Sequence, residues 1–295
     1  MSTPETIEAQ ESRLSPETIA ILLTTFNGEQ YLAEQIDSLF CQSDTDWHLY
    51  IHDDGSTDAT SQIVSRYMEL HPDKITLLQY TPQGGACKNF MSMLKVVDAP
   101  LYMLCDQDDV WNANKIELSR RQLQSLSIPA DKPAVVFTDM TIVDRQLNTL
   151  HPSFWQYSGI RPEAVTCFYD CVISMAAGCT MLFNKAARDA ALLKYTPRNI
   201  PHIMMHDVWI IDCCYAAGGE VSHVPTPTLL YRQHGNNQLG AISASRITPL
   251  YRVSNFFSMF QTNIHFYRML NAIAPFSLLQ FIKAKIRYRR CHLKS

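Results

Sequence analysis

The sequence predicts an α/β protein in which helices flank a mostly parallel, doubly wound sheet. Between residues 19 and 126, short apolar strand patterns alternate with segments whose apolar residues recur at helical spacing. Acidic and polar segments follow several of these strands, at the carboxyl ends where α/β sheets place their ligands. The chain has 295 residues, 46% apolar and 18% charged, which suits one large globular domain or two modest ones.

The first half of the chain contains four pairs of a strand and a helix. Strands are expected at residues 19–24, 47–52, 74–79 and 101–105. Helices are expected at residues 29–40, from a cap at Ser56 or Thr57 to about 70, from Gly84-Gly85 to about 97, and from about 114 to 126. Each strand is short and rich in apolar or β-branched residues, as buried strands are.

The second half is less regular. Strands are expected at residues 134–138 and 178–183, and helices at about 207–217, 250–272 and 277–292. Residues 221–231 have an extended pattern that contains Pro225 and Pro227. Proline cannot donate to a strand ladder, so this segment is expected to be an edge strand or a loop.

Charge is distributed unevenly along the chain. Residues 241–295 contain nine Lys or Arg and no Asp or Glu, whereas the preceding part holds 16 basic and 28 acidic side chains. We expect a mobile leader at residues 1–17, a main domain at 18–240 that divides into halves at about 111/112, and a basic helical extension at 241–295. The extension is expected either to lie on an anionic membrane surface or to pack on the acidic body.

The sequence carries no export or membrane-spanning signal. The N-terminus is acidic and polar, without the basic start and apolar core of a signal peptide, and no segment has the ~18 apolar residues that span a bilayer. The nine cysteines are scattered and include no Cys-x-x-Cys pair. This usage is typical of reduced cytosolic thiols and not of a disulfide framework or a zinc site.

Three carboxylates, those of Asp106, Asp108 and Asp109, directly follow the apolar strand at 101–105. Unpaired carboxylates that pack together repel one another and resist desolvation, so such a cluster indicates a bound cation. Oxygen ligands favour Mg²⁺ or Mn²⁺ over zinc. The sequence therefore predicts a divalent-metal site at this strand end.

Two other strand ends also carry polar side chains. The hydroxyls, aromatic ring and amide of Thr24, Thr25, Phe26 and Asn27 suit a nucleobase and a ribose, although Asn-Gly is also a plain turn. Asp54 can accept a hydrogen bond from a base N–H or a ribose hydroxyl. A helix cap with a turn would explain the neighbours of Asp54 but not Asp54 itself.

Three later positions each have a functional and a structural interpretation. The helix opened by Gly84-Gly85 carries Lys88, and its amides can approach a phosphate, although no dinucleotide or P-loop fingerprint is present. Asp207 falls at a helix N-terminus, where the helix dipole favours an ionised carboxylate and where many acids are only caps. His234 lies in a polar loop, where a histidine is either solvated or a metal ligand.

Taken in order, these segments resemble glycosyltransferase family 2 of the GT-A fold, over about residues 19–240. The matching motifs are T-T-F-N, D-D-G-S-T-D, D-Q-D-D-V-W and H-D-V-W, each after an expected strand or at a helix start. With Y-R-Q-H-G-N-N at 231–237, they are similar to those of bacterial rhamnosyltransferases of surface-polysaccharide assembly, including lipopolysaccharide. The resemblance implies a Rossmann-like, mostly parallel sheet flanked by helices, with a nucleotide half at about 18–111 and an acceptor half at about 112–240.

The resemblance also implies a role for each matching residue. Asp207 corresponds to the catalytic base of an inverting enzyme. The remaining roles are nucleotide and donor binding by Thr24, Thr25, Phe26, Asn27, Asp54, Lys88, Asp106 and Gln107, metal binding by Asp106, Asp108, Asp109 and His234, and a sugar pocket walled by Trp111, His206 and Trp209. Asp108 is preferred over Asp109 as the principal metal ligand. Each tryptophan has core packing as its alternative.

The implied reaction is inverting, Mn²⁺- or Mg²⁺-dependent transfer of a single hexosyl unit from a nucleoside-diphosphate sugar. The donor would be dTDP-rhamnose-like or a UDP-sugar, and the acceptor a hydroxyl of a glycan or a lipid-linked saccharide. The chain has neither the Q-x-x-R-W motif nor the membrane spans of processive synthases, which favours transfer of one sugar. A cytoplasmic enzyme is expected, with peripheral attachment to the cytoplasmic face of the inner membrane as an open alternative and no nucleic-acid partner.

Two other classes of function stay open on the sequence. A sugar-phosphate nucleotidyltransferase would need basic residues in the loop after the first strand to hold a triphosphate, and residues 24–30 contain none. A non-catalytic partner in a polysaccharide assembly complex would be expected to have lost the acids at 106, 108 or 207, and all three are present.

Overall fold

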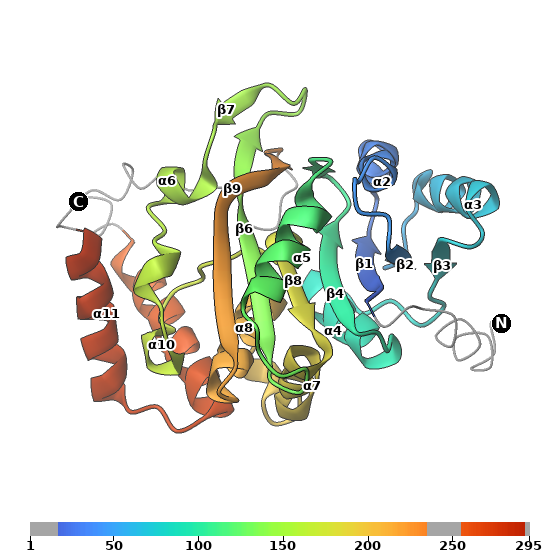
Figure 1. Ribbon diagram of the computed structural model, residues 1–295. Helices are drawn as coiled ribbons and strands as arrows, with labels where there is room; N and C mark the ends of the chain where they lie inside the picture. The colour runs from blue at the N-terminus through green and yellow to red at the C-terminus, as the bar shows by residue number, and fades with distance from the viewer. Residues whose placement is uncertain (1–16, 235–254, 293–295) are drawn as a thin grey trace.

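The computed structural model describes residues 17–234 and 255–292. The predicted leader therefore lies outside the described residues except for Glu17, and so does the predicted boundary near residue 240. The described part is an α/β structure in which helices cover both faces of a central sheet (Figure 1).

The strands of the described residues form one nine-stranded sheet in the order β3-β2-β1-β4-β8-β6-β9-β5, with β7 paired to β6. Their bounds are β1 Ile19–Thr25, β2 Trp47–Asp53, β3 Ile75–Leu77, β4 Leu101–Asp106, β5 Val110–Trp111, β6 Ala134–Val143, β7 Thr149–His151, β8 Met181–Asn184 and β9 Glu220–Arg232. The α-helices are α2 Leu32–Phe40, α3 Thr60–Leu70, α4 Ala86–Val96, α5 Lys115–Ser125, α6 Phe154–Ser158, α7 Lys185–Lys194, α8 His206–Ala216, α10 Phe256–Ile273 and α11 Leu278–His292. Short 3₁₀-helices occupy Pro162–Ala164, Phe168–Asp170, Gly178–Thr180 and Ile200–His202.

Strand β1 shows why the sheet is covered on both faces. All seven of its residues are buried, and β1 pairs in parallel with β2 on one side and β4 on the other. Ile19, Ile21 and Leu23 pack in the hydrophobic cluster with α2, α3 and α5. Ala20 and Leu22 pack in the cluster with α4, α7, α8 and α10. Alternate residues point to opposite faces, so a continuous apolar run requires helices on both sides.

The mostly parallel sheet is confirmed, but its second half is mixed. Strand β8 runs antiparallel to both β4 and β6, whereas β6 and β9 are parallel to each other. Strand β9 pairs along β6 over its length, so the loop alternative for residues 221–231 is wrong. Within the described residues, β5 joins the other side of β9 only at Leu229 and Leu230, which leaves an edge beside Pro225 and Pro227.

The expected cap of the second helix is wrong. Helix α3 begins at Thr60, after an N-cap residue that makes no side-chain cap hydrogen bond. Ser56 and Thr57 serve the neighbouring loop instead. The Ser56 hydroxyl accepts a hydrogen bond from the Asn27 N–H at 2.8 Å, and the Thr57 N–H donates to the Asn27 side-chain oxygen at 2.9 Å. Hydrogen bonds between two loops thus use polar groups that the sequence pattern assigned to a helix cap.

The two C-terminal helices pack on the body, at the end of the sheet opposite α3 (Figure 1). Phe281 and Ala284 of α11 are buried in the hydrophobic cluster, and Arg287 forms an ion pair with Asp170. This is the arrangement expected for a basic extension that packs on an acidic body. No helix of the described residues is long and apolar enough to cross a bilayer, and the eight cysteines described are free.

Candidate active site

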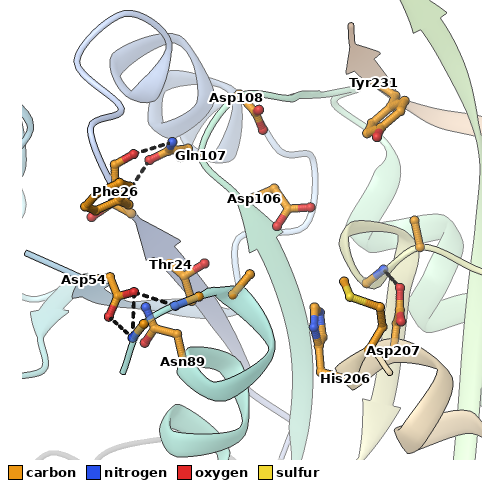
Figure 2. Close-up of a pocket in the computed structure, with 17 residues that line it drawn as sticks. Thr24, Phe26, Asp54, Asn89, Asp106, Gln107, Asp108, His206, Asp207 and Tyr231 are labelled. Carbon is orange, nitrogen blue, oxygen red and sulfur yellow. Dashed lines mark hydrogen bonds between the residues drawn. The ribbon is translucent and has the colours of Figure 1, made fainter. Parts of the chain in front are cut away.

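A cavity of about 520 Å³ lies at the carboxyl ends of β1 and β4 (Figure 2). Nine residues predicted from the sequence line it: Thr24, Thr25, Phe26, Asp54, Asp106, Gln107, Asp108, His206 and Asp207. In the view of Figure 2, Asp106 and Asp108 lie between Asp54 on one side and Asp207 on the other. Residues from four separate parts of the chain therefore face a single space.

Asp54 caps the loop that leads into α4. Its carboxylate accepts hydrogen bonds from the backbone N–H groups of Gln83 at 2.5 Å, Gly84 at 3.1 Å and Gly85 at 2.9 Å. Burial by itself raises the pKa of Asp54, but these N–H groups outweigh it and hold the pKa below its usual value. Gly85 adopts a φ of 113°, a conformation that suits glycine. Asp54 is thus an ionised carboxylate at the cavity wall.

The loop after β1 is fixed by Gln107 of the acidic segment. The Phe26 N–H donates to Gln107 Oε1 at 2.9 Å, and Gln107 Nε2 donates to the Phe26 carbonyl at 3.0 Å. A Cβ atom on Gly28 would lie 2.3 Å from Gln107 Oε1, so a larger residue there would displace the Gln107 side chain. Phe26 itself is 55% exposed, which leaves its ring free to contact a ligand at the mouth of the cavity.

Asn27 does not line the cavity. It has a φ of 47°, and its side-chain oxygen accepts the Thr57 N–H at 2.9 Å. Left-handed asparagines are common in turns. The turn that the sequence left open as an alternative therefore describes the geometry of Asn27.

The three acids of the 106–109 segment have different surroundings. Asp106 and Asp108 line the cavity, whereas Asp109 is fully buried beneath it and accepts the Arg232 N–H at 3.3 Å. Among the described residues, Asp109 Oδ2 accepts no N–H or O–H hydrogen bond. Burial, followed by the charges of Asp108 and Asp207, raises the pKa of Asp106 to about 7. Burial and the charges of Asp108 and Asp106 also raise the pKa of Asp109.

This cluster fits a divalent cation. One ligand atom each from Asp106, Asp109 and Cys179 lies within 4.8 Å of the others. Carboxylates whose mutual repulsion raises their pKa values are what a cation would stabilise, because it cancels this repulsion. The buried Asp109 oxygen that accepts no N–H or O–H hydrogen bond from the described residues points to the same conclusion. Cys179 is a member of this cluster that the sequence pattern did not indicate.

His234 contacts the acidic segment without lining the cavity. Its Nε2 lies 2.6 Å from Asp108 Oδ2, and its ring stacks on Tyr31 at a centroid distance of 5.1 Å. His234 thus holds the carboxylate that was predicted to bind metal.

Asp207 lies in the first turn of α8 and is 6% exposed. Its Oδ2 accepts the Gly178 N–H at 3.1 Å, and its Oδ1 accepts the Val208 N–H at 2.7 Å. A Cβ atom on Gly178 would lie 2.5 Å from His206 Nε2, so a larger residue would displace this arrangement. Both carboxylate oxygens are oriented by backbone donors, which fixes the acid at the cavity wall.

His206 lies next to this acid and lines the same cavity. It is 4% exposed, and neither ring nitrogen has a hydrogen-bond partner among the described residues. Burial lowers the pKa of His206, and the charge of Asp207 opposes this only in part. The imidazole is therefore neutral near pH 7.

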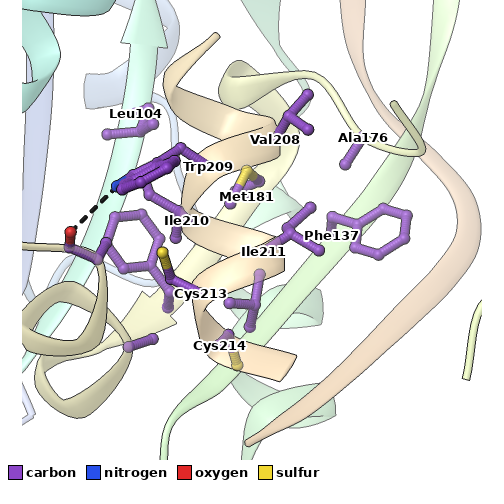
Figure 3. Close-up of a cluster of buried hydrophobic side chains, with 14 of the residues drawn as sticks. Leu104, Phe137, Ala176, Met181, Val208, Trp209, Ile210, Ile211, Cys213 and Cys214 are labelled. Atoms are coloured by element: carbon purple, nitrogen blue, oxygen red, sulfur yellow. Dashed lines mark hydrogen bonds between the residues drawn. The ribbon is translucent and has the colours of Figure 1, made fainter. Parts of the chain in front are cut away.

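The two tryptophans proposed for the sugar pocket are core residues. Trp209 is fully buried among apolar side chains around α8 (Figure 3), and its Nε1 donates to the Ala191 carbonyl at 3.0 Å. Trp111 is 3% exposed and packs in the cluster on the other face of the sheet. Neither lines the cavity. Helix α8 has apolar residues on all of its sides because it is enclosed between the sheet, α7 and α10.

Lys88 is exposed on α4 and does not line the cavity, whereas the adjacent Asn89 is buried and does. Asn89 and Tyr231 are the polar lining residues that the sequence analysis did not assign. Tyr231 opens the Y-R-Q-H motif, and Asn89 lies in the first turn of the glycine-opened helix, so each was adjacent to a recognised signal.

Residues 20–189, more than half of the chain, match the family model described as glycosyl transferase family 2. The chain belongs to glycosyl transferase family 2. It is therefore a glycosyltransferase, and the sugar-phosphate nucleotidyltransferase and the non-catalytic partner are set aside. The family and fold predicted from the sequence are confirmed.

Similar proteins include a dTDP-rhamnosyl transferase, RfbG of Shigella flexneri, which is 29% identical over 226 residues, 74% of this chain and 74% of RfbG. Among solved structures, S. aureus TarS 1-349 in complex with UDP-GlcNAc has a TM-score of 0.55 at 18% identity and covers 90% of this chain and 79% of that one. The mannosyltransferase PcManGT from Pyrobaculum calidifontis, in complex with GDP-Man and Mn²⁺, has a TM-score of 0.53 at 15% identity and covers 99% and 82%. The structural similarities show the shared fold.

Proposed function

We propose that this glycosyltransferase moves a single sugar from a nucleoside-diphosphate sugar to an acceptor hydroxyl, with inversion at the anomeric carbon. The observation that carries the proposal is the single cavity lined by Asp54, by Asp106 and Asp108, and by Asp207. These acids divide the cavity into three parts with different chemistry.

The Asp54 side suits the nucleoside. The ionised carboxylate of Asp54 can accept from a base N–H or a ribose hydroxyl, and the exposed ring of Phe26 offers an apolar surface to a base. Thr24 adds a hydroxyl at the same wall. The family members that use dTDP- or UDP-sugars, such as the dTDP-rhamnosyl transferase RfbG, support a nucleotide donor, and a dTDP- or UDP-sugar is proposed here.

The Asp106 and Asp108 side suits the diphosphate. Asp106 and the buried Asp109, whose carboxylate oxygens lie close together, would hold Mn²⁺ or Mg²⁺. Asp108, which lines the cavity and is oriented by His234, would complete the site. When bound, the cation would neutralise charge on the departing nucleoside diphosphate. Without a cation, the carboxylates would repel the phosphates of the donor.

Asp207 is proposed as the general base. Its carboxylate would take the proton from the acceptor hydroxyl while that oxygen forms the bond to the anomeric carbon. The bond from this carbon to the diphosphate oxygen breaks on the opposite face, so the configuration inverts and the nucleoside diphosphate leaves with the electron pair. The N–H groups of Gly178 and Val208 orient the carboxylate, and the neutral His206 adds no charge beside it.

The proposal is tested by titration calorimetry of dTDP and UDP with the full chain, with and without Mn²⁺, followed by NMR of the product of the tighter nucleotide's sugar. We expect binding that needs Mn²⁺ and a product whose anomeric configuration is opposite to that of the donor. Retention of configuration would contradict a single displacement with Asp207 as base. Equal binding in EDTA would contradict the cation site.

We also propose that α11 lies against an anionic membrane surface on the cytoplasmic side, where a lipid-linked saccharide acceptor would be presented. Its outward side chains include the apolar residues Leu278, Leu279, Ile282 and Ile286, with exposed fractions of 46–62%. Lys283, Arg289 and Arg290 are exposed on the same helix. Such a surface suits anionic lipid. Replacing Ile282 and Ile286 by Ser should reduce co-sedimentation with phosphatidylglycerol vesicles, and unchanged co-sedimentation would contradict the proposal.

A further inference from the structure

A second hollow lies between helix α10 and residues 193–202, outside the donor cavity. Two depressions of about 350 and 690 Å³ share His202 and Arg268, and together they form one groove between α10, the end of α7 and residues 196–202. Five basic side chains line this basic groove: Lys194, Arg198, His202, His265 and Arg268. They come from separate segments of the chain and converge on one surface hollow.

The segments that form the basic groove carry no acidic side chain. Residues 190–206 and 241–295, from which the lining comes, contain no Asp or Glu. Within the described part of the chain, no ion pair involves Lys194, Arg198 or Arg268. A hollow lined by one sign of charge attracts ions of the opposite sign and concentrates them there.

The basic groove is held next to the segment that ends at Asp207. His202 ends a 3₁₀-helix, and Met205, three residues later, lines the donor cavity. The Asn199 side-chain amide donates to the Lys194 carbonyl at 2.9 Å and to the Ala272 carbonyl at 3.3 Å. These bonds tie residues 199–202 to both α7 and α10, so the groove has a fixed position relative to the acid.

We infer that the basic groove binds a phosphate or diphosphate group of the acceptor and thereby brings an acceptor hydroxyl toward Asp207. This inference rests on the proposed function, because it assumes that Asp207 faces the acceptor. Two guanidinium groups, an ammonium and two imidazoles suit a group with several charged oxygens, since guanidinium binds phosphate oxygens in pairs. The exposed heads of Arg198 and Arg268 leave these donors available.

The test uses inorganic pyrophosphate as the probe, titrated calorimetrically into the full chain in buffer free of divalent cations. Under these conditions the carboxylates of the donor cavity repel the probe. The variant Arg198→Gln/Arg268→Gln should bind pyrophosphate at least about tenfold more weakly, as expected when charged hydrogen bonds are lost. The matched control Arg66→Gln/Arg121→Gln removes the same charge from exposed positions on α3 and α5 and should bind like wild type.

Three outcomes would overturn the inference. The first is the absence of saturable pyrophosphate binding to the wild-type chain. The second is equal loss in both double variants, which would mean attraction by net charge alone. The third is a groove variant that binds pyrophosphate like wild type but no longer binds phosphatidylglycerol vesicles. This result would mean that the groove contacts a lipid surface. Nucleotide binding in the presence of Mn²⁺ should be the same in the groove variant and the wild-type chain. Failure of the proposed function has a different sign, namely a wild-type chain that binds no nucleotide.

Discussion

His234 Nε2 lies 2.6 Å from Asp108 Oδ2, although 126 residues separate the two along the chain. The same imidazole stacks on Tyr31, which precedes α2. Three distant segments therefore meet at the rim of the cavity. The contact orients a carboxylate that would otherwise move freely among like charges, and groups that hold a metal-binding carboxylate in this way contribute to metal affinity.

His234→Ala should weaken metal binding. Loss of the contact frees Asp108, and partners of metal ligands are worth about 10- to 100-fold in metal affinity. The measurement is the Mn²⁺ concentration that gives half-maximal nucleotide binding. His71→Ala is the control, because His71 stacks on Phe40 and does not line the cavity. An unchanged Mn²⁺ requirement in His234→Ala would show that the contact is structural only.

Asp207→Asn should abolish turnover but not nucleotide binding. An amide cannot take the acceptor proton, and a positioned base contributes about 10²- to 10⁴-fold to a rate. Asp212→Asn is a matched control on the same helix. Burial raises the pKa of Asp212 well above its usual value and so favours its neutral form, which an amide resembles in shape and charge. Turnover of Asp207→Asn at the rate of Asp212→Asn would mean that another residue is the base.

Asp106 should make stability depend on pH when no divalent cation is present. Burial and then the charges of Asp108 and Asp207 raise its pKa from 3.8 to about 7, so the folded state binds the proton more tightly than the unfolded state. The stabilisation that proton binding to Asp106 provides is fully present below the pKa of this group in the unfolded state. It decreases as the pH rises through the folded-state pKa of about 7. In EDTA, the melting temperature should fall between pH 5 and pH 8, and less so for Asp106→Asn.

Added Mn²⁺ should reverse that fall for the wild-type chain, because a ligand that binds only the folded state raises its melting temperature. Asp106→Asn should gain less from Mn²⁺ than the wild-type chain does. A pH profile in EDTA that is identical for the two proteins would show that Asp106 is ionised in both the folded and unfolded states.

Trp209→Phe should reduce stability without changing nucleotide affinity. The substitution leaves a cavity in the cluster of Figure 3 and leaves the Ala191 carbonyl without its donor, at a cost of about 1–3 kcal/mol. Chemical denaturation measures the free energy of unfolding, and calorimetry measures nucleotide binding. If the variant lost affinity for the sugar donor while its stability stayed unchanged, Trp209 would be a residue of the sugar pocket and not of the core.

Much of the site could be predicted from local sequence, and the errors have a common cause. Asp54, Asp106, Asp108 and Asp207 each follow a buried strand or begin a helix, and local pattern is enough to place them at one edge of the sheet. The cap assigned to Ser56 and Thr57 failed because the loop after β1 competes for their hydroxyl and N–H groups. Sequence spacing cannot report a contact between two loops.

The sequence alone determined the class of fold, the alternation of strands and helices from β1 to β4, and the family. These follow from hydrophobic periodicity and from polar residues at strand ends, which are local properties. Only the tertiary structure decided which neighbouring residues face the cavity. Asp108 faces it while Asp109 is buried, and Asn89 lines it while Lys88 does not. Adjacent side chains point in different directions, and packing against distant segments determines which of them faces the cavity.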